Sequence, residues 1–350
     1  MKILQINSAK AFGGGEKHLV DLCRGLQQRR HEVFVAVRPN NQWQEKLDFL
    51  PEENLLRIPL RNSLDFLSAR QIAEFVRGKN IEIIHAHVAR DYSIAALASR
   101  VCKTPLVLTR HLTYKLSALH RLTFKQAKRV IAVSNGVAES LSFAKDKVSV
   151  IYNGVDVNEL GKIEKANSDL VVATIGELRE HKGQADFIKA AAIIIEKHPK
   201  VKFLIIGKDN SANQSYQIIL ENLVEELNLK DKVIFTGWLE NPLEIYGAFD
   251  IFVSSARSEP FGLVIAEAMA SEKAIVATET VGAKELLTDN ESGKLLSVGN
   301  IEQLAEAITE LLESEHLRQT LGKNARMRAK DFFSLERMVS ETEKIYQAVA

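Results

Sequence analysis

The sequence predicts an α/β protein made of two similar domains, each with a parallel β-sheet covered by helices. Its length of 350 residues is enough for two domains. Short apolar, β-branched segments alternate with longer amphipathic segments, and this alternation restarts near the middle of the chain. With 46% hydrophobic and 26% charged residues, the composition is that of a globular protein and excludes a disordered or collagen-like chain.

Five segments of the first half are predicted strands because they are short, apolar and rich in β-branched residues. They lie at 3–7, 32–38, 81–87, 106–109 and 130–133. A helical pattern occupies the gaps between them, which is the arrangement that joins parallel strands. The first half is therefore expected to form one doubly wound domain.

The same pattern resumes in the second half. The predicted strands lie at 170–175, 202–207, 232–236, 251–254 and 274–277, again with a helical pattern in each gap. Segment 159–169 is polar and without strong periodicity, so we expect the linker there. These boundaries predict a first domain over 1–160, a second over 161–333, and a final helix over 334–350 that returns to the first domain.

Neither a leader nor a metal framework is indicated. The apolar stretch at the start of the chain is too short for a signal peptide, and no apolar run reaches the ~18 residues of a spanning helix, so we expect a cytoplasmic protein. The two cysteines, Cys23 and Cys102, form no C-x-x-C motif, and no cluster has zinc-ligand spacing. We therefore expect no metal. Walker, G-x-S-x-G and nucleic-acid-binding signatures are also missing from the sequence.

The net charge of +1 hides a strong asymmetry. Residues 1–160 contain 24 Lys and Arg against 15 Asp and Glu, whereas residues 161–350 contain 22 against 30. Between residues 92 and 138 there are eight bases and no acid. Such a stretch indicates an anionic partner for the first half.

A run of three glycines follows the first predicted strand. Gly13, Gly14 and Gly15 open a helical pattern, so backbone N–H groups at the helix start could accept a phosphate. The dinucleotide fingerprint would require glycine where His18 stands and an acid where Arg38 stands, which disfavours NAD. A tight turn without a ligand is the alternative interpretation.

A second loop of interest contains Arg179 and Lys182, between a predicted strand and a helix. Ligands of open α/β folds bind at this edge of the sheet. The two cations could neutralise a leaving diphosphate without a metal. The alternative is a solvated charged loop, and Lys182, next to Gly183, is the stronger candidate.

The strongest local motif is a pair of acids, Glu259 and Glu267, around Pro260 and an apolar helical run. This pattern places Glu259 at the entrance of a helix and Glu267 about two turns inside it. An acid in an apolar helix needs a partner. Structurally, Glu267 could pair with an internal base and Glu259 could complement the helix dipole. Functionally, both carboxylates could accept hydrogen bonds from ligand hydroxyls.

Taken in order, these motifs resemble the retaining nucleotide-sugar glycosyltransferases of family 4, which have the GT-B fold. The resemblance rests on Gly13-Gly14-Gly15, His85-Ala86-His87, His111, Val133-Ser134, Asn153-Gly154-Val155-Asp156, Gly176…Lys182-Gly183, and Glu259-x7-Glu267. It covers almost the whole chain. It implies two Rossmann-like domains that face each other across a donor cleft, with the last helix returning to the first domain.

The resemblance also implies roles for single residues. Lys182 would bind the donor diphosphate, Glu267 the ribose, and Glu259 the donor sugar. Further donor contacts would come from the backbone of Phe261, Gly262 and Leu263, from Gly13, Gly14 and Gly15, and from His111 near the transferred sugar. Glu177 stands where the family commonly has arginine, and Arg179 is the candidate to replace it.

The implied reaction is sugar transfer with retention, by same-face attack and without cofactor or metal. The missing D-x-D motif agrees with stabilisation of the leaving group by Lys182 and helix dipoles. A UDP-sugar is the expected donor, and a saccharide or lipid-linked acceptor in lipopolysaccharide or other cell-envelope synthesis is expected. The alternatives are a nucleotide-sugar epimerase, a phosphorylase, or a non-catalytic sugar-binding partner. His85 and His87 share one face of a predicted strand and could suggest a metal pair, but no third ligand is evident in the sequence, so a polar strand end is the favoured interpretation.

The acceptor side is expected in the acid-free stretch. Segment 114–128 places Leu116, Leu119 and Leu122 at helical spacing. Opposite them lie the four bases Lys115, Arg121, Lys125 and Lys128. Helices of this kind lie on anionic membranes, so we expect peripheral attachment to the inner membrane face. The alternative is a core-packing helix with a solvated basic face.

Overall fold

The computed structural model describes residues 1–41, 43–114, 116, 118–162 and 169–350. It divides the chain into two compact units. Unit 1 comprises Met1–Gly154 and Leu335–Ala350, and unit 2 comprises Val155–Ser334. Among the helices described, none is long and apolar enough to cross a membrane.

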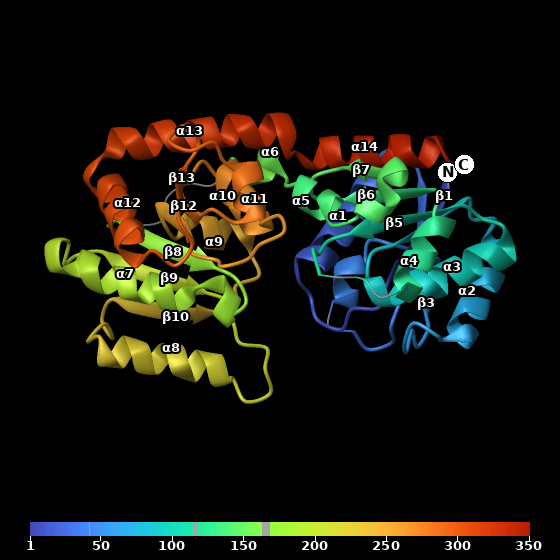
Figure 1. The fold of residues 1–350 in the computed structure, drawn as a ribbon, viewed down its shortest axis with the longest axis horizontal. Helices are drawn as coiled ribbons and strands as arrows, with labels where there is room; N and C mark the ends of the chain where they lie inside the picture. The colour runs from blue at the N-terminus through green and yellow to red at the C-terminus, as the bar shows by residue number, and fades with distance from the viewer. Residues whose placement is uncertain (42, 115, 117, 163–168) are drawn as a thin grey trace. The chain divides into compact units, whose positions relative to one another are not determined.

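Unit 1 contains a parallel seven-stranded sheet in the order β3-β2-β1-β4-β5-β6-β7 (Figure 1). Its strands are β1 Lys2–Asn7, β2 Glu32–Val37, β3 Leu55–Arg57, β4 Ile83–Ala86, β5 Leu106–Arg110, β6 Arg129–Ala132 and β7 Val148–Val150. All five expected strands are present within two residues of their expected ends. The sequence did not predict β3 and β7, which are three-residue edge strands and too short to show a hydrophobic period.

Helices cover both faces of this sheet. Helices α1 (Gly14–Gln28) and α14 (Leu335–Gln347) pack together, whereas α2 (Phe66–Lys79), α3 (Ala89–Cys102) and α4 (Ala118–Gln126) pack in a row. Shorter elements are α5 Asn135–Glu139 and 3-10 turns at Gln44–Leu47, Glu52–Asn54 and Ser142–Lys147. An added Cβ at Gly25 would lie 2.4 Å from Val339 Cγ2, so this glycine lets α14 pack directly on α1.

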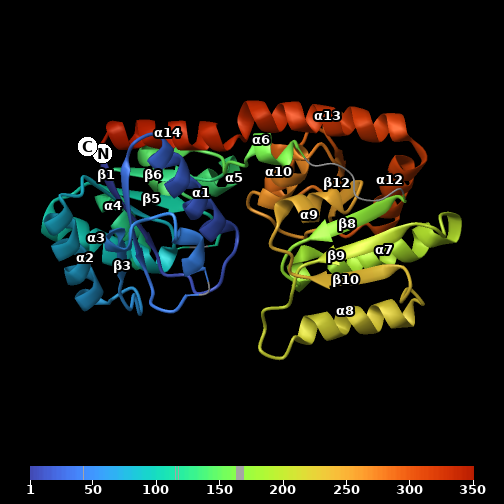
Figure 2. The same ribbon diagram turned by 180° about the vertical axis from the view of Figure 1, so that it is seen from behind.

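Unit 2 contains a parallel six-stranded sheet in the order β10-β9-β8-β11-β12-β13 (Figure 2). Its strands are β8 Val171–Ile175, β9 Lys202–Ile206, β10 Val233–Gly237, β11 Ile251–Ser254, β12 Ala274–Thr278 and β13 Lys294–Leu296. Only β13, a short edge strand, was not expected. Apolar side chains from both β8 and β11, such as Val172 and Val253, are fully buried in its core.

The helices of unit 2 form two groups. Helices α7 (Gln184–Lys197), α8 (Ser215–Glu226) and α12 (Ile301–Glu313) share one core with the sheet. The others are α6 Val157–Leu160, α9 Pro242–Gly247, α10 Leu263–Ala270, α11 Val281–Leu286 and α13 Glu315–Phe332. Helix α6 packs on α10 and α13, so the chain enters unit 2 at Val155 and not after Leu160. Residues 163–168 of the expected linker lie outside the described residues.

Both sheets reverse their strand order once. The reversal falls between β1 and β4 in unit 1 and between β8 and β11 in unit 2. Loops that leave the carboxyl ends of the two strands on either side of a reversal diverge and leave room for a ligand. The fold therefore directs attention to the loops after β1, β4, β8 and β11.

Candidate functional site

In unit 2 the two loops at the strand reversal bring Lys182 and Glu259 together. Lys182 ends a 3-10 turn, Glu180–Lys182, after β8, and Glu259 follows β11. Lys182 Nζ donates to Glu259 Oε2 at 2.5 Å. The two side chains remain 25% and 16% exposed, so the pair lies at the surface of the sheet edge and not in the core.

Close backbone packing fixes this pair. Gly183 has φ +71°, and an added Cβ would lie 1.9 Å from the Ser255 carbonyl oxygen, so only glycine fits here. Ser255 Oγ donates to the Gly183 carbonyl at 2.8 Å. Arg257 N donates to the His181 carbonyl at 2.8 Å. These contacts hold the Lys182 turn against the loop that contains Glu259.

Helix α10 begins later than the sequence indicated. Gly262 has φ +93° and precedes the first helical residue, Leu263, so Glu259 lies in the loop before the helix and not at its entrance. An added Cβ at Gly282 would lie 2.1 Å from the Phe261 carbonyl oxygen, and Gly282 N donates to the Glu259 carbonyl at 2.9 Å. The backbone of Gly282 therefore packs closely against the loop 259–262 and holds it in place.

Because α10 begins at Leu263, Glu267 lies about one turn inside the helix and not two, and its carboxylate accepts a hydrogen bond from a hydroxyl. Tyr246, at the end of α9, donates from its OH to Glu267 Oε2 at 2.7 Å. Burial and the nearby Glu267 raise the pKa of Tyr246, so its hydroxyl stays protonated and donates. Sequence reasoning missed Tyr246, because no spacing relates it to Glu267.

Arg179 lies on the same loop as Lys182 but carries an ion pair of its own. Its Nε lies 2.8 Å from Glu177 Oε2, and its side chain is 57% exposed. Asn210 Nδ2 also donates to Glu177, at 3.1 Å. Glu177, which stands where the family commonly has arginine, thus forms an ion pair with Arg179, the residue that was expected to replace that arginine.

In unit 1 the glycine turn lies at the start of α1. Gly13 is the N-cap and has no side chain to cap the helix, and the Glu16 carboxylate accepts from the backbone N–H groups of Gly13 and Glu16. An added Cβ at Gly15 would lie 4.0 Å from the ring of His111. Asn7 Nδ2 donates to Glu16 Oε1 at 3.1 Å, and burial raises the pKa of Glu16. The turn and His111 therefore share one region.

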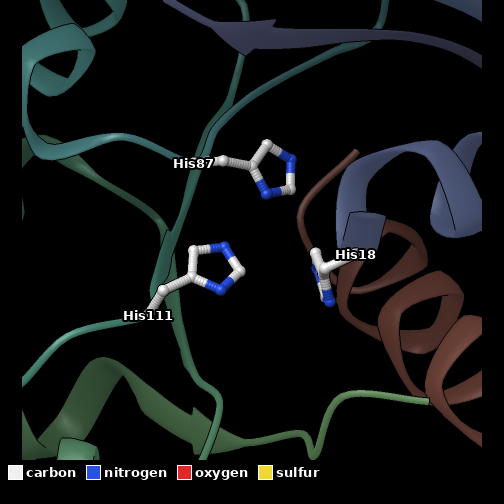
Figure 3. A group of neighbouring side chains, drawn as sticks. All are labelled: His18, His87 and His111. Atoms are coloured by element: carbon white, nitrogen blue, oxygen red, sulfur yellow. The ribbon is translucent and has the colours of Figure 1, made fainter. Parts of the chain in front are cut away.

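His111 is half-buried and lies against the buried imidazoles of His18 and His87 (Figure 3). Ring centroids lie 4.9 Å apart for His18 and His111, 5.5 Å for His18 and His87, and 5.9 Å for His87 and His111. His85 is also close to His87, at 4.2 Å, but is engaged elsewhere. Its Nδ1 lies 2.6 Å from the Tyr346 hydroxyl and its Nε2 2.7 Å from Thr109 Oγ1. Sequence reasoning saw His85 and His87 and missed His18.

The expected basic helix is shorter than predicted, because the chain enters β6 at Arg129. Lys115 lies outside the described residues, and Lys128 follows α4. Leu122 is 63% exposed, whereas Phe124 is fully buried, so the predicted leucine face does not pack into the core through Leu122. Arg121 lies over the Phe143 ring at 5.4 Å, and Lys125 is exposed.

Two adjoining hollows lie beside α4. One, of about 450 Å³, is lined by three bases, Arg100, Lys103 and Lys128, and none of its described lining residues is acidic. The other, of about 220 Å³, is lined in part by Leu64, Phe66 and Leu122. Because Leu106 begins β5 and Lys128 precedes β6, the basic hollow lies at the amino-terminal edge of the sheet, away from the loops described above.

Two family models match the chain. One, described as glycosyl transferases group 1, matches residues 157–328, and the other, glycosyltransferase family 4, matches residues 12–159. The N-acetyl-alpha-D-glucosaminyl L-malate synthase of Bacillus anthracis is 28% identical and aligns with 97% of this chain and 95% of its own length. A lipopolysaccharide core biosynthesis glycosyltransferase of Rhizobium meliloti, LpsE, is 26% identical over 92% of each chain.

Solved structures agree on the fold. The Anabaena protein HepE, crystallised with UDP and glucose, superposes with a TM-score of 0.85 at 25% identity and covers 99% of this chain and 100% of its own. A glycosyltransferase of Rickettsia africae superposes with a TM-score of 0.87 at 22% identity and covers 99% and 98%. The expected pair of Rossmann-like, parallel-sheet domains of the GT-B fold is confirmed.

Proposed function

Because this chain belongs to the group 1 glycosyltransferases, we propose that it moves a sugar from a nucleotide-sugar donor to a saccharide or lipid-linked acceptor, with retention of the anomeric configuration. The observation that carries this proposal is the Lys182–Glu259 pair at the strand reversal of unit 2. A partly exposed ion pair can open and exchange one partner for a ligand, whereas a buried pair of charges cannot do so cheaply.

Unit 2 supplies the proposed donor site. The Lys182 ammonium would leave Glu259 to bind the diphosphate, and Glu259 with the backbone at 261–263 would then bind the sugar. Glu267, oriented by Tyr246, would accept hydrogen bonds from the ribose. The complex of HepE with UDP and glucose favours a UDP-sugar as donor.

The proposed chemistry is a same-face displacement. The bond between the anomeric carbon and the phosphate oxygen breaks, and the acceptor oxygen bonds to that carbon on the same face. The acceptor proton passes to the departing phosphate oxygen. Lys182 stabilises the charge on the leaving diphosphate, and the other residues act by positioning. His111 is the unit 1 residue that we propose contacts the transferred sugar.

Unit 1 supplies the proposed acceptor side. Its net positive charge and the basic hollow suit an anionic or lipid-linked acceptor at the inner face of the membrane. LpsE, CapM of Staphylococcus aureus and LpcC of Rhizobium leguminosarum are named for lipopolysaccharide core or capsular polysaccharide biosynthesis. Their names favour a role for this chain in cell-envelope glycan synthesis.

A donor screen with product analysis tests the proposal. The protein is incubated with nucleotide sugars and simple glycosides in excess EDTA, and the products are examined by NMR for the anomeric proton. Free nucleotide together with a glycoside of unchanged configuration is the expected result. Inversion, a strict requirement for added Mg²⁺, epimerised donor without acceptor, phosphate-dependent cleavage, or binding without turnover would each contradict it.

A further inference from the structure

Three histidines from three separate elements converge in unit 1. His18 lies in the second turn of α1, His87 directly follows β4, and His111 directly follows β5. One nitrogen from each ring can be chosen so that all three lie within 4.8 Å of one another. Figure 3 shows the rings arranged around a common space.

The spacing of the rings suits one small ion. Zinc binds imidazole nitrogen at about 2.0–2.1 Å, so three imidazoles on a tetrahedral ion have ring centroids roughly 5 Å apart. The three observed centroid separations lie between 4.9 and 5.9 Å.

Two nitrogens of the cluster have no other partner. Within the part of the chain that the structure describes, neither Nδ1 of His87 nor Nε2 of His111 has a hydrogen bond, whereas His18 interacts with the side chain of Asn153. His18 and His87 are 3% and 2% exposed. Buried polar atoms without a partner cost free energy and are rare, so two in one place indicate a ligand.

The hydrogen bonds around His87 set its tautomer. Gln5 donates from Nε2 to the Tyr346 hydroxyl at 3.1 Å, which turns Gln5 Oε1 toward His87 Nε2 at 2.7 Å. An amide oxygen only accepts, so His87 Nε2 must carry the proton and Nδ1 must carry the lone pair. Metal-binding histidines are oriented by such a bond from the other ring nitrogen.

The rings are also neutral near pH 7. Burial lowers the pKa of His18 to about 4 and holds the pKa values of His87 and His111 well below their usual range. Neutral imidazole offers a lone pair and does not repel a cation.

From this geometry we propose that His18, His87 and His111 form a binding site for Zn²⁺ or a similar borderline transition-metal ion. Three imidazoles leave the fourth tetrahedral position open for water or an anionic ligand. Magnesium and calcium prefer oxygen ligands and would not bind here. All three histidines belong to unit 1, whereas Lys182 and Glu259 belong to unit 2.

Occupation of this site has a consequence that rests on the proposed function. His111 lies beside Gly15 of the glycine turn, and we assign both to the donor site. A metal ion bound to His111 would remove this side chain from the sugar. Zinc is therefore expected to inhibit transfer and not to support it, and transfer itself needs no metal.

The test uses the full chain without an affinity tag, freed of metal by a chelator. Co²⁺ serves as the probe because a tetrahedral Co²⁺ complex absorbs visible light strongly, and Zn²⁺ is then added as competitor. One Co²⁺ per chain, displaced by one Zn²⁺, is expected. His18→Ala and, separately, His111→Gln should weaken binding about 100-fold or more, since even an outer-shell change weakens metal affinity 10–100-fold.

The matched control is His316→Gln, because His316 is exposed on α13. It should bind Co²⁺ as the unchanged protein does, and melting curves establish that each variant is folded. Absence of the visible band in the unchanged protein, or equal affinity of His18→Ala and His316→Gln, would refute the site. The measurement involves no sugar donor, so it fails or succeeds independently of the transfer assay.

Discussion

The two units place polar side chains at the same position of the same topology but use opposite chemistry there. In unit 1 the strand reversal is surrounded by neutral imidazoles, whose pKa values burial holds low. In unit 2 it is occupied by an ion pair between Lys182 and Glu259. Strand order decides where a ligand can bind, whereas burial decides whether the side chains there can carry charge.

This difference separates two roles. The ion pair is partly exposed, so solvent or a phosphate can replace one partner without burying the other charge. The imidazoles of unit 1 are enclosed, and His85 is fixed at both nitrogens by Tyr346 and Thr109. We infer that unit 2 compensates the charge that develops during transfer, while unit 1 positions uncharged groups.

The largest effect is expected from Lys182→Ala. Loss of the cation leaves the departing diphosphate without its compensating charge, and truncation of one partner of a hydrogen-bonded charge pair costs roughly 2–5 kcal/mol. We expect kcat/KM for the donor to fall at least about 30-fold, because each 1.36 kcal/mol is a factor of ten. Initial rates of nucleotide release measure this.

The control for this experiment is Lys208→Ala. Lys208 is exposed and lies two residues after the end of β9, one strand from the reversal. Both variants lose one ammonium from the same sheet edge, so melting temperatures near that of the parent protein are expected for both. Equal rates for the two variants would remove Lys182 from the site.

A smaller loss is expected from Glu267→Gln. The amide oxygen can still accept from the Tyr246 hydroxyl, so the packing of α10 is kept while the charge is lost. We expect about a tenfold rise in the donor KM, the size of one hydrogen bond to a charged group. Tyr246→Phe keeps the carboxylate and should have a weaker effect. A larger loss in Tyr246→Phe than in Glu267→Gln would assign Glu267 a structural role.

A substitution in the buried hydrogen-bond network of unit 1 should lower the free energy of unfolding, because these groups are uncharged. Tyr346→Phe removes the hydroxyl that links Gln5 and His85, which leaves buried polar atoms unpaired at a cost of roughly 1–3 kcal/mol. Urea unfolding followed by Trp43, which is buried in unit 1, measures this in a Trp238→Phe background. Tyr114→Phe, at a side chain 73% exposed, should leave the midpoint unchanged. An unaltered midpoint for Tyr346→Phe would show that the network adds no stability.

The sequence predicted the parts of this comparison unevenly. The buried strands were found because parallel strands covered on both faces are continuous apolar runs, whereas β3, β7 and β13 are too short to produce one. Lys182 and Glu259 were both identified, yet their pairing was not, because 77 residues separate them and only the strand order brings them together.

Other site residues carried no sequence signal at all. Tyr246 and His18 lie in helices, where a tyrosine or histidine is ordinarily a packing residue, and nothing in their spacing relates them to Glu267 or His111. Helix α4 was expected to continue to residue 128 but ends at Gln126, because the chain enters β6 at Arg129. Such errors arise where tertiary contacts decide, since a period in the sequence records which residues could share a face and not what covers it.

The last comparison concerns the surface of unit 1 beside helices α2, α3 and α4. Exposed apolar side chains gather there: Leu64, Phe66, Leu67 and Leu122 are 62–69% exposed. Leu64, Phe66 and Leu122 line the hollow next to the basic one, and both hollows share Arg100. Apolar side chains beside bases are typical of surfaces that rest on anionic membranes.

Vesicle sedimentation tests this surface with a charge-matched pair of variants. Each base near an anionic membrane contributes about 1 kcal/mol, so Lys125→Glu with Lys128→Glu should reduce binding to phosphatidylserine-containing vesicles at least about tenfold. Lys197→Glu with Lys200→Glu makes the same charge change on unit 2, where both lysines are exposed, and should retain binding. Added salt should release the unchanged protein, because surface charges are screened beyond about 10 Å at 0.1 M. Equal binding to uncharged vesicles would show that charge does not drive attachment, and equal loss in both double variants would show that net charge alone acts. Either result would make this face an ordinary solvated surface.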